Sequence, residues 1–383
     1  MPWKSLSVME ERIKFVILAS REGINISSLC RDFGICRSTG YLWLNRYLQS
    51  GNLSEVRELS RRPHYIANKT SSALEQQIIT LRKRYGWGGK KLRELMLRKG
   101  QDMKVATINR ILKRNGLIHQ KDSHRPAVKR FERKYPNELW QMDFKGDYKL
   151  PVGRCYPLSL LDDHSRYAIG LYALQKQDTE TVYNCLVQAF ESYGVPDAIL
   201  TDHGIPWWGN SNHHGLTRLS VRLINQGIKL YFSGIRHPQT QGKVERFHRT
   251  LSDAVSHHGR PSTITGWKEL LEFFLDEYNY VRPHEALEMA TPIEHYQPSR
   301  KAYDPTPKAW NYPEGSIVKE LNTQGCLTFN QRRYFVCEAL AEQEVGIKQM
   351  RNKLIVSYRQ MYIREIETET GRSTSLLTPV SLT

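Results

Sequence analysis

The sequence has 383 residues, 39% hydrophobic and 10% aromatic, which is typical of a globular protein with two to four domains. No apolar run is long enough to span a membrane, and the N-terminus lacks the apolar segment of a secretory signal, so we expect a cytoplasmic protein. The net charge of +17 is concentrated before residue 136, where 29 Lys and Arg face 11 Asp and Glu; the remainder has 27 against 28. This basic third predicts a polyanionic partner, nucleic acid rather than membrane, although a basic face kept for solubility is the alternative.

Cysteine and histidine spacing predicts no zinc site. The six cysteines, at positions 30, 36, 155, 185, 326 and 337, form no C-x-x-C pair, and they suggest no disulfide framework. The pairs His213–His214 and His257–His258 lack further ligands at metal-site spacing, so we interpret them as surface residues.

The first predicted domain covers residues 1–62 and contains three helices. The sequence predicts a helix over 8–19, a short helix for which Ser27 is the candidate N-cap and which stops at Gly34, and a third helix over 37–48. A short helix, a glycine turn and a longer helix form the helix-turn-helix pattern, in which the last helix enters the major groove. An ordinary three-helix bundle is the alternative. The candidate DNA contacts are Arg37, Ser38, Thr39 and Arg46.

A second helical domain is predicted over residues 63–122. Its first helix spans 72–85 and places Leu74, Ile78 and Leu81 on one face. Two shorter helices follow, and Lys113 and Arg114 on the last one are candidate DNA contacts. Residues 123–136 are basic and poor in apolar side chains, which predicts a linker that follows phosphates.

The central region, residues 137–290, predicts an α/β domain with a mixed five-stranded sheet. Three runs joined by short connections favour consecutive antiparallel strands, and helix, strand, helix, strand and helix follow. Asp143 lies at the centre of the first strand, and Asp202 lies at the end of a later buried strand. Glu245 lies on a helix whose buried stripe is predicted to contain Val244, Phe247 and Leu251.

Five motifs in this region occur in a characteristic order. They are WQMDFKGD, LLDDHSRY, GVPDAILTDHG, HPQTQGKVERFHRTL and YNYVRPHEAL, within residues 137–287. This order resembles that of DDE transposases in the retroviral-integrase superfamily, which have a ribonuclease H-like catalytic core. The helical region in front resembles the tandem helix-turn-helix modules of bacterial insertion-sequence transposases. The resemblance implies a bacterial DNA transposase.

Three carboxylates suit the chemistry of such an enzyme. Phosphodiester cleavage with two divalent ions about 3.5–4 Å apart requires carboxylates of which one bridges both ions. We expect Asp143 to be the bridging ligand, with Asp202 on one ion and Glu245 on the other. An all-oxygen site favours two Mg²⁺ ions, and Mn²⁺ is expected to substitute.

The helix that carries Glu245 also supplies candidate contacts to a DNA end, namely Lys243, Arg246 and Arg249. The sequence departs from the resembled pattern at Ser252, where many relatives have a cation, and at His203, where relatives usually have Asn.

A polar and aromatic segment lengthens the interval between Asp202 and Glu245 to 42 intervening residues. Trp207 and Trp208 within it either stack on an unpaired base or pack the loop, and we favour packing.

Other carboxylates in the central region are interpreted as structural. Asp162 and Asp163 precede a polar turn between two strands, and Gly146 separates Asp147 from the strand that carries Asp143. Residues 291–313 are rich in proline and predict an extended linker. Residues 314–383 contain short runs of β-formers and predict a small β-barrel that contacts DNA or a neighbouring subunit.

The leading hypothesis is a transposase that binds the terminal inverted repeats of its element, cleaves the 3′ ends and joins them to target DNA. Because two double-stranded DNA ends must be brought together, we expect a homo-oligomer. One alternative is a metal-dependent nuclease that cuts without strand transfer. The other is a helix-turn-helix regulator without catalytic activity, which would require loss of a carboxylate.

Overall fold

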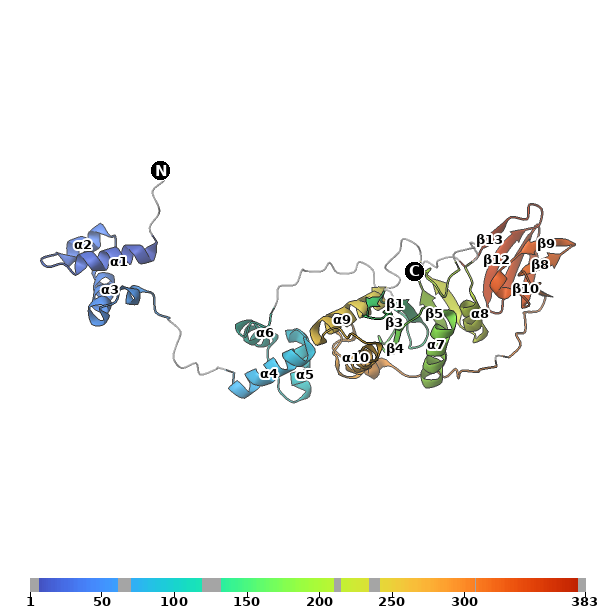
Figure 1. Cartoon of the computed structure of the whole chain (residues 1–383), viewed down its shortest axis with the longest axis horizontal. Coiled ribbons are helices and arrows are strands. Elements are labelled where there is room, and N and C mark those ends of the chain that lie inside the picture. The colour runs from blue at the N-terminus through green and yellow to red at the C-terminus, as the bar shows by residue number, and fades with distance from the viewer. Residues whose placement is uncertain are drawn as a thin grey trace. The chain divides into compact units, whose positions relative to one another are not determined.

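The computed structural model describes residues 7–60, 70–118, 132–209, 215–233, 242–306 and 308–377. The chain divides into two compact units, Met1–Ser71 and Ser72–Thr383. The second helical module, the α/β core and the C-terminal β-strands therefore belong to one unit. Figure 1 labels their helices and strands.

The first unit contains the three predicted helices, α1 (Val8–Ala19), α2 (Ile26–Asp32) and α3 (Arg37–Ser50), followed by the short 3₁₀ helix η1 (Leu53–Val56). The prediction that Ser27 caps the second helix was wrong. Asn25 occupies the cap, and its side chain accepts the N–H of Ser28 at 3.2 Å.

The packing of α3 against α1 depends on a glycine in the helix. A Cβ atom at Gly40 would lie 2.5 Å from the Cys30 sulfur and 2.8 Å from the Phe15 ring, so a larger residue would separate the helices. Trp43 and Leu44 are buried beside this contact. The helical prediction for this region is confirmed, and α3 is its longest helix.

The second unit begins with another helical module. It contains the predicted first helix α4 (Ser72–Tyr85), then α5 (Gly89–Arg98) and α6 (Val105–Arg114). Ile78 and Leu81 of α4 are buried in a core shared with α5 and α6, while Leu74 packs at its margin.

A mixed sheet forms the centre of the second unit. Its strands are β1 (Trp140–Phe144), β2 (Tyr148–Lys149), β3 (Arg154–Asp162), β4 (Ala168–Leu174), β5 (Ala198–Thr201) and β6 (Lys229–Phe232). β1 pairs antiparallel with β3 and parallel with β5, β3 pairs with β4, and β5 pairs parallel with β6. The predicted five-stranded mixed sheet is confirmed, and the short β2 adds a hairpin to β3.

Helices cover both faces of this sheet. α7 (Thr179–Tyr193) and α8 (Arg218–Asn225) bury their apolar residues on one face, together with Trp140 and Met142 of β1. α9 (Gly242–His258) and α10 (Ile264–Asp276) pack on the other face against β3 and β4. A π-helical turn, η3 (Glu277–Val281), and two short 3₁₀ helices, η4 (Glu285–Leu287) and η5 (Pro292–His295), continue from α10.

The C-terminal domain is all-β, as predicted. Its strands are β7 (Ile317–Glu320), β8 (Cys326–Phe329), β9 (Arg332–Phe335), β10 (Glu344–Met350), β11 (Lys353–Tyr358), β12 (Met361–Glu367) and β13 (Ser373–Ser375), with the 3₁₀ helix η6 (Glu338–Leu340) between β9 and β10. Five of them form an antiparallel sheet in the order β13-β12-β11-β10-β7, and β8 and β9 form a separate hairpin. Closure into the predicted barrel is not seen in the described strands.

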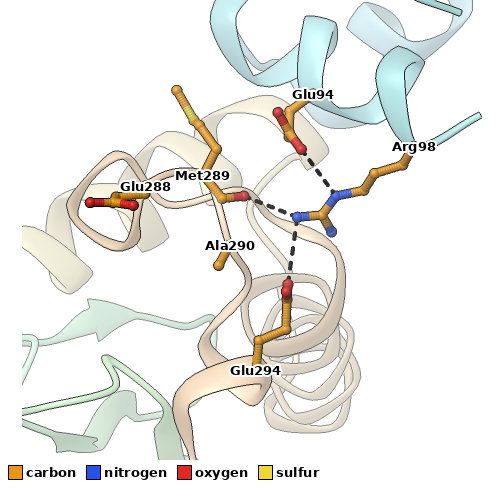
Figure 2. Close-up of a pocket in the computed structure, with 6 residues that line it drawn as sticks. All are labelled: Glu94, Arg98, Glu288, Met289, Ala290 and Glu294. Atoms are coloured by element: carbon orange, nitrogen blue, oxygen red, sulfur yellow. Dashed lines mark hydrogen bonds and ion pairs between the residues drawn. The ribbon is translucent and has the colours of Figure 1, made fainter. Parts of the chain in front are cut away.

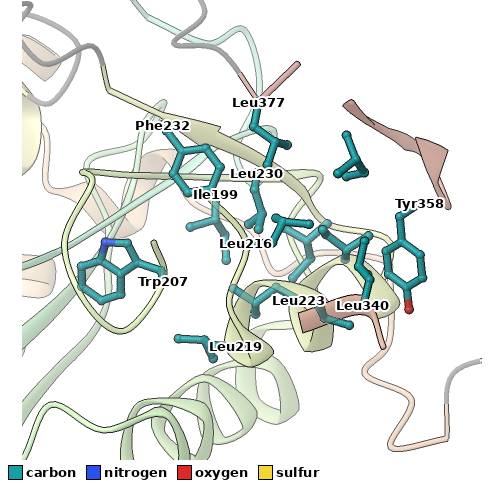
Figure 3. Close-up of a cluster of buried hydrophobic side chains, with 14 of the residues drawn as sticks. Ile199, Trp207, Leu216, Leu219, Leu223, Leu230, Phe232, Leu340, Tyr358 and Leu377 are labelled. Carbon is teal, nitrogen blue, oxygen red and sulfur yellow. The ribbon is translucent and has the colours of Figure 1, made fainter. Parts of the chain in front are cut away.

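The hydrophobic core of the mixed sheet continues into this β-domain. Figure 3 shows Leu340, Tyr358 and Leu377 in the same buried cluster as Leu216 and Leu223. The Tyr358 hydroxyl donates to the Asn225 side chain at 2.6 Å. The β-domain therefore contacts the α/β domain of its own chain, a contact that the sequence did not predict. In the part of the chain that the structure describes, no helix is long and apolar enough to cross a membrane.

Candidate active site

Asp143 lies on the central strand of the mixed sheet. β1 has β3 on one side and β5 on the other. Trp140, Gln141 and Met142 are fully buried, and the Asp143 side chain, which follows them, is 20% exposed. β1 is therefore buried at its start, and the Asp143 carboxylate near its end is partly exposed.

Asp202 directly follows the last residue of β5. The parallel register places Gln141 of β1 beside Leu200 of β5. Continued by two residues, this register places Asp143 beside Asp202. Both carboxylates therefore lie at the carboxyl-terminal ends of neighbouring strands, which are about 4.8 Å apart.

Two N–H groups fix the orientation of the Asp202 carboxylate. The backbone N–H of Gly204 and the indole N–H of Trp207 each donate to Asp202 Oδ1 at 2.8 Å. A Cβ atom at Gly204 would lie 2.8 Å from the same oxygen, so a side chain at this position would displace the carboxylate. The loop after β5 is therefore folded around Asp202.

Glu245 lies in the first turn of α9. Val244, Phe247 and Leu251 are buried against the sheet, as the spacing predicts, while Glu245 is exposed. The helix packs against β1 and β3, and the backbone N–H of Val244 in its first turn donates to the Gln141 side chain of β1 at 3.1 Å, so this turn lies near the strand that carries Asp143.

Asp202 and Glu245 are both close enough for their charges to act on Asp143. The pKa of Asp143 is raised to about 7, first by burial and then by the charge of Asp202, with a smaller contribution from Glu245; the backbone N–H of Phe144 opposes the rise. Negatively charged side chains therefore surround Asp143 at the carboxyl-terminal end of β1. Among the described residues, no three acidic, histidine or cysteine side chains are already close enough together to hold a metal ion.

A buried polar network holds the first turn of α9. Lys243 forms an ion pair of 2.5 Å with Asp163, which also accepts the side-chain N–H of Gln141 at 2.8 Å. Gln141 in turn accepts the backbone N–H of Val244 at 3.1 Å. Gln141 lies two residues before Asp143 on the same face of β1. One side chain therefore links the strand of Asp143 to the turn of Glu245.

Lys243→Met is expected to destabilise the protein by about 3–5 kcal/mol, because it leaves the fully buried Asp163 without its cation. Denaturant unfolding measures the loss. The double variant Lys243→Met/Asp163→Asn is the control and should recover most of it. A single variant as stable as the wild type would contradict the role of this pair.

His248 packs beside Asp143 from α9. Its Nε2 is 2.9 Å from the Ser159 hydroxyl, and its Nδ1 is 3.7 Å from Asp143 Oδ2. Ser159 is also the residue opposite Asp143 across the β1–β3 ladder. Burial lowers the pKa of His248 to about 3, so its imidazole is neutral at physiological pH.

The predicted DNA contacts on α9 differ in their surroundings. Arg246 and Arg249 are exposed, and contact with DNA stays a prediction for both. Lys243 is largely buried by its ion pair, because the turn after β3 folds over the helix end. Ser252 donates its hydroxyl to the His248 carbonyl at 2.9 Å.

The predicted DNA contacts of the two helical modules lie on the last α-helix of each module, α3 and α6. On α3, Arg37 and Ser38 are exposed, Thr39 is half-buried, and Arg46 lies 4.8 Å above the Trp43 ring.

On α6 both predicted cations are exposed, and Arg114 forms an ion pair with Glu75 of α4 while Lys113 lies beside it. These contacts also stay predictions.

Asp162 and Asp163 are structural, as interpreted from the sequence. Asp162 Oδ2 accepts both the backbone N–H and the hydroxyl of Ser165, at 2.8 and 2.6 Å, and so closes the turn between β3 and β4. Asp147 pairs with Arg154 at 2.6 Å on the β2–β3 hairpin. His257 contacts the Lys83 carbonyl at 2.8 Å, and His213 and His214 lie outside the described residues.

A polar pocket between α5 and the η4–η5 segment is separate from these carboxylates. Figure 2 shows Arg98 reaching between Glu94, Glu294 and the Met289 carbonyl, with the carbonyl at 2.9 Å. Arg98 thus joins α5 to the segment that contains Met289 and Glu294.

Sequence reasoning missed the partners of the three carboxylates. Gln141 and His248 lie in the quoted motifs, but their roles depend on contacts with distant strands and helices. Trp207 is an aromatic residue five positions after Asp202, which drew attention to it in the sequence. Its hydrogen bond to the Asp202 carboxylate is seen only once the loop is folded.

Three protein-family models match parts of the sequence. Two models described as "Integrase core domain" match residues 133–238 and 226–292, and a "Homeodomain-like domain" matches residues 8–55. Residues 133–292 belong to the integrase core domain family. A homeodomain-like domain joined to an integrase core implies DNA binding.

The relatives of this family member include proteins of mobile elements. It is 24% identical over 327 residues to the transposase for transposon Tn552 of Staphylococcus aureus, covering 70% of this chain and 62% of that protein. It is 25% identical over 291 residues to an uncharacterized 31.7 kDa protein of insertion element IS407 from Burkholderia multivorans, covering 72% and 92%. The chain therefore spans less than two thirds of the Tn552 transposase.

Solved integrase structures show a weaker likeness. The catalytic core of HTLV-2 integrase in complex with magnesium has a TM-score of 0.33 at 17% identity, covering 42% of this chain and 97% of that chain. A simian T-cell lymphotropic virus intasome has a TM-score of 0.37 at 14% identity, covering 76% and 99%.

Proposed function

We propose that the protein is a DNA transposase that binds the ends of its element, cleaves them and joins the exposed 3′ ends to target DNA. The observation that supports the proposal is the placement of Asp143 and Asp202 at the ends of neighbouring parallel strands, with Glu245 near enough for its charge to contribute to the raised pKa of Asp143. Charges of one sign gathered at the edge of a sheet require a cation or a proton to offset their repulsion.

The donor set fits divalent metal ions that prefer oxygen. The three side chains are carboxylates, and Mg²⁺ binds through one or two carboxylates while it keeps several waters. Asp143 would hold both ions, and Asp202 and Glu245 one each. Because Glu245 is exposed, its side chain has freedom to turn toward Asp143 when an ion binds. When bound, two such ions activate the attacking oxygen and stabilise the leaving 3′ oxygen.

The chain's own residues would position DNA for two successive reactions at this site. In the first, the oxygen of water attacks a phosphorus atom, and the 3′ oxygen leaves and takes up a proton. In the second, that 3′-OH attacks a phosphorus atom of target DNA and releases a new 3′-OH. Arg246 and Arg249 flank Glu245 on α9 and would bind phosphates of the element end.

The helix-turn-helix modules would hold the ends while the core acts on them. The positive charge of the chain is concentrated before residue 136, as expected for phosphate binding. Because two ends are joined to one target, we propose that the active form is an oligomer of this chain on double-stranded DNA.

The test is a joining assay with the purified protein. The protein is incubated with Mg²⁺, a target plasmid and a duplex taken from the DNA that flanks its coding sequence, where inverted repeats are expected. Products in which the 3′ end is covalently joined to the plasmid support a transposase. Nicked ends without joining would instead support a nuclease, and binding without any reaction would support a regulator.

A further inference from the structure

The indole N–H of Trp207 donates to a carboxylate that the proposed function assigns to metal binding. We propose that Trp207 is a positioning residue that orients Asp202 for a divalent ion. This inference rests on the proposed function, since it concerns how the same site is assembled.

The hydrogen bond reaches one selected oxygen of Asp202. Trp207 Nε1 and the Gly204 backbone N–H both lie 2.8 Å from Oδ1. Two donors on one oxygen fix the rotation of the carboxylate. Oδ2 is then the oxygen directed to a ligand, and Asp202 requires no rearrangement when an ion arrives.

Trp207 is itself held from several directions. Its side chain is 2% exposed and belongs to the large hydrophobic core, as Figure 3 shows. Its backbone carbonyl accepts the hydroxyl of the buried Ser220 on α8 at 2.6 Å. A donor fixed by packing on one side and by α8 on the other can hold a carboxylate at a defined position.

The same ring also contacts the strand of Asp143. Trp207 stacks on Phe144, the residue after Asp143, with ring centroids 5.3 Å apart and planes inclined by 15°. One side chain thus contacts the end of β1 through its face and Asp202 through its N–H. We infer that it sets the separation of the two carboxylates, which repel each other when both are ionised.

Trp208 provides a matched control beside it. It is half-buried, and its ring makes edge contacts with His203 and Phe232 at 4.4 and 4.6 Å. It shares the residue type and the loop of Trp207 and also has aromatic neighbours, while Asp202 receives its hydrogen bonds from Gly204 and Trp207.

The experiment measures binding of Mn²⁺ alone, by electron paramagnetic resonance of the free ion, in the full-length protein without DNA. The variants are Trp207→Phe, Trp208→Phe and Asp202→Asn. A fourth protein carries 3-benzothienylalanine at position 207, an isostere of tryptophan that lacks the N–H. Thermal unfolding in EDTA reports the stability of each protein separately from its metal affinity.

We expect both changes at position 207 to weaken Mn²⁺ binding by about 10- to 100-fold, the range found when a partner of a metal ligand is lost. Trp208→Phe should bind as the wild type does. The isostere should unfold in EDTA at the wild-type temperature, which separates the lost N–H from lost packing even where Trp207→Phe is destabilised.

Two results would overturn the inference in distinguishable ways. Wild-type affinity in the benzothienyl protein would eliminate the role of Trp207 and leave the proposed function intact. Wild-type Mn²⁺ binding that Asp202→Asn leaves unchanged would eliminate the metal site itself, and the role of Trp207 with it.

Discussion

Asp143→Asn is expected to abolish both cleavage and joining of element ends, by roughly 10³-fold or more, because an amide cannot bridge two cations. Asp202→Asn and Glu245→Gln should behave in the same way. Binding of the end duplex should stay at the wild-type level, since the helix-turn-helix modules are separate from these residues. Gel-based joining assays and fluorescence anisotropy with the same duplex measure the two properties.

Asp147→Asn is the matched control for this series. Asp147 lies four residues after Asp143 and pairs with Arg154 on the β2–β3 hairpin, outside the group of converging carboxylates. Its variant should retain activity. If any one of the three proposed ligands could be replaced without loss of joining, the assignment of that residue would be wrong.

Asp143→Asn should also stabilise the metal-free protein. The pKa of Asp143 rises from 3.8 to about 7 in the folded state, and one pKa unit corresponds to 1.36 kcal/mol. Ionised Asp143 therefore destabilises the fold at pH 8 by about 4 kcal/mol at most, and the neutral amide removes this penalty. Urea unfolding in EDTA, at a series of pH values, measures the difference.

The pH dependence has a defined sign. At a pH below about 4 the carboxyl is protonated in both the folded and the unfolded chain, and its favourable contribution is fully present. As the pH rises through about 7, folded Asp143 must ionise, and the wild type loses stability relative to Asp143→Asn. Added Mg²⁺ should restore the wild type at pH 8 and leave the variant unchanged. A difference that stays constant from pH 4 to 8 would contradict the raised pKa.

The sequence was sufficient for the elements with strong periodicity or clear end signals. The helices that begin at Val8 and Ser72 were predicted because their apolar spacing is unambiguous. The order of strands and helices also predicted the mixed sheet, since short connections favour antiparallel neighbours. Asn25 was missed as a helix cap because two suitable cap residues, Asn25 and Ser27, lie within three positions.

The contacts around the candidate site could not be predicted in the same way. Lys243 is in a cationic run, and no helical pattern shows that the turn containing Asp163 folds over the helix end and buries it. Trp207 was correctly expected to pack, but its hydrogen bond depends on how the loop after β5 returns to Asp202. Closure of the C-terminal strands depends on long-range pairing, which alternating apolar residues do not specify.

The central claim is that Asp143, Asp202 and Glu245 form one metal site. Anomalous scattering from crystals of the full chain grown with Mn²⁺ tests it most directly. We predict Mn²⁺ between the three side chains, with carboxylate oxygens of Asp143 and Asp202 about 2.0–2.3 Å from it. Mn²⁺ bound only at other residues, in a protein that still joins DNA ends, would contradict the claim.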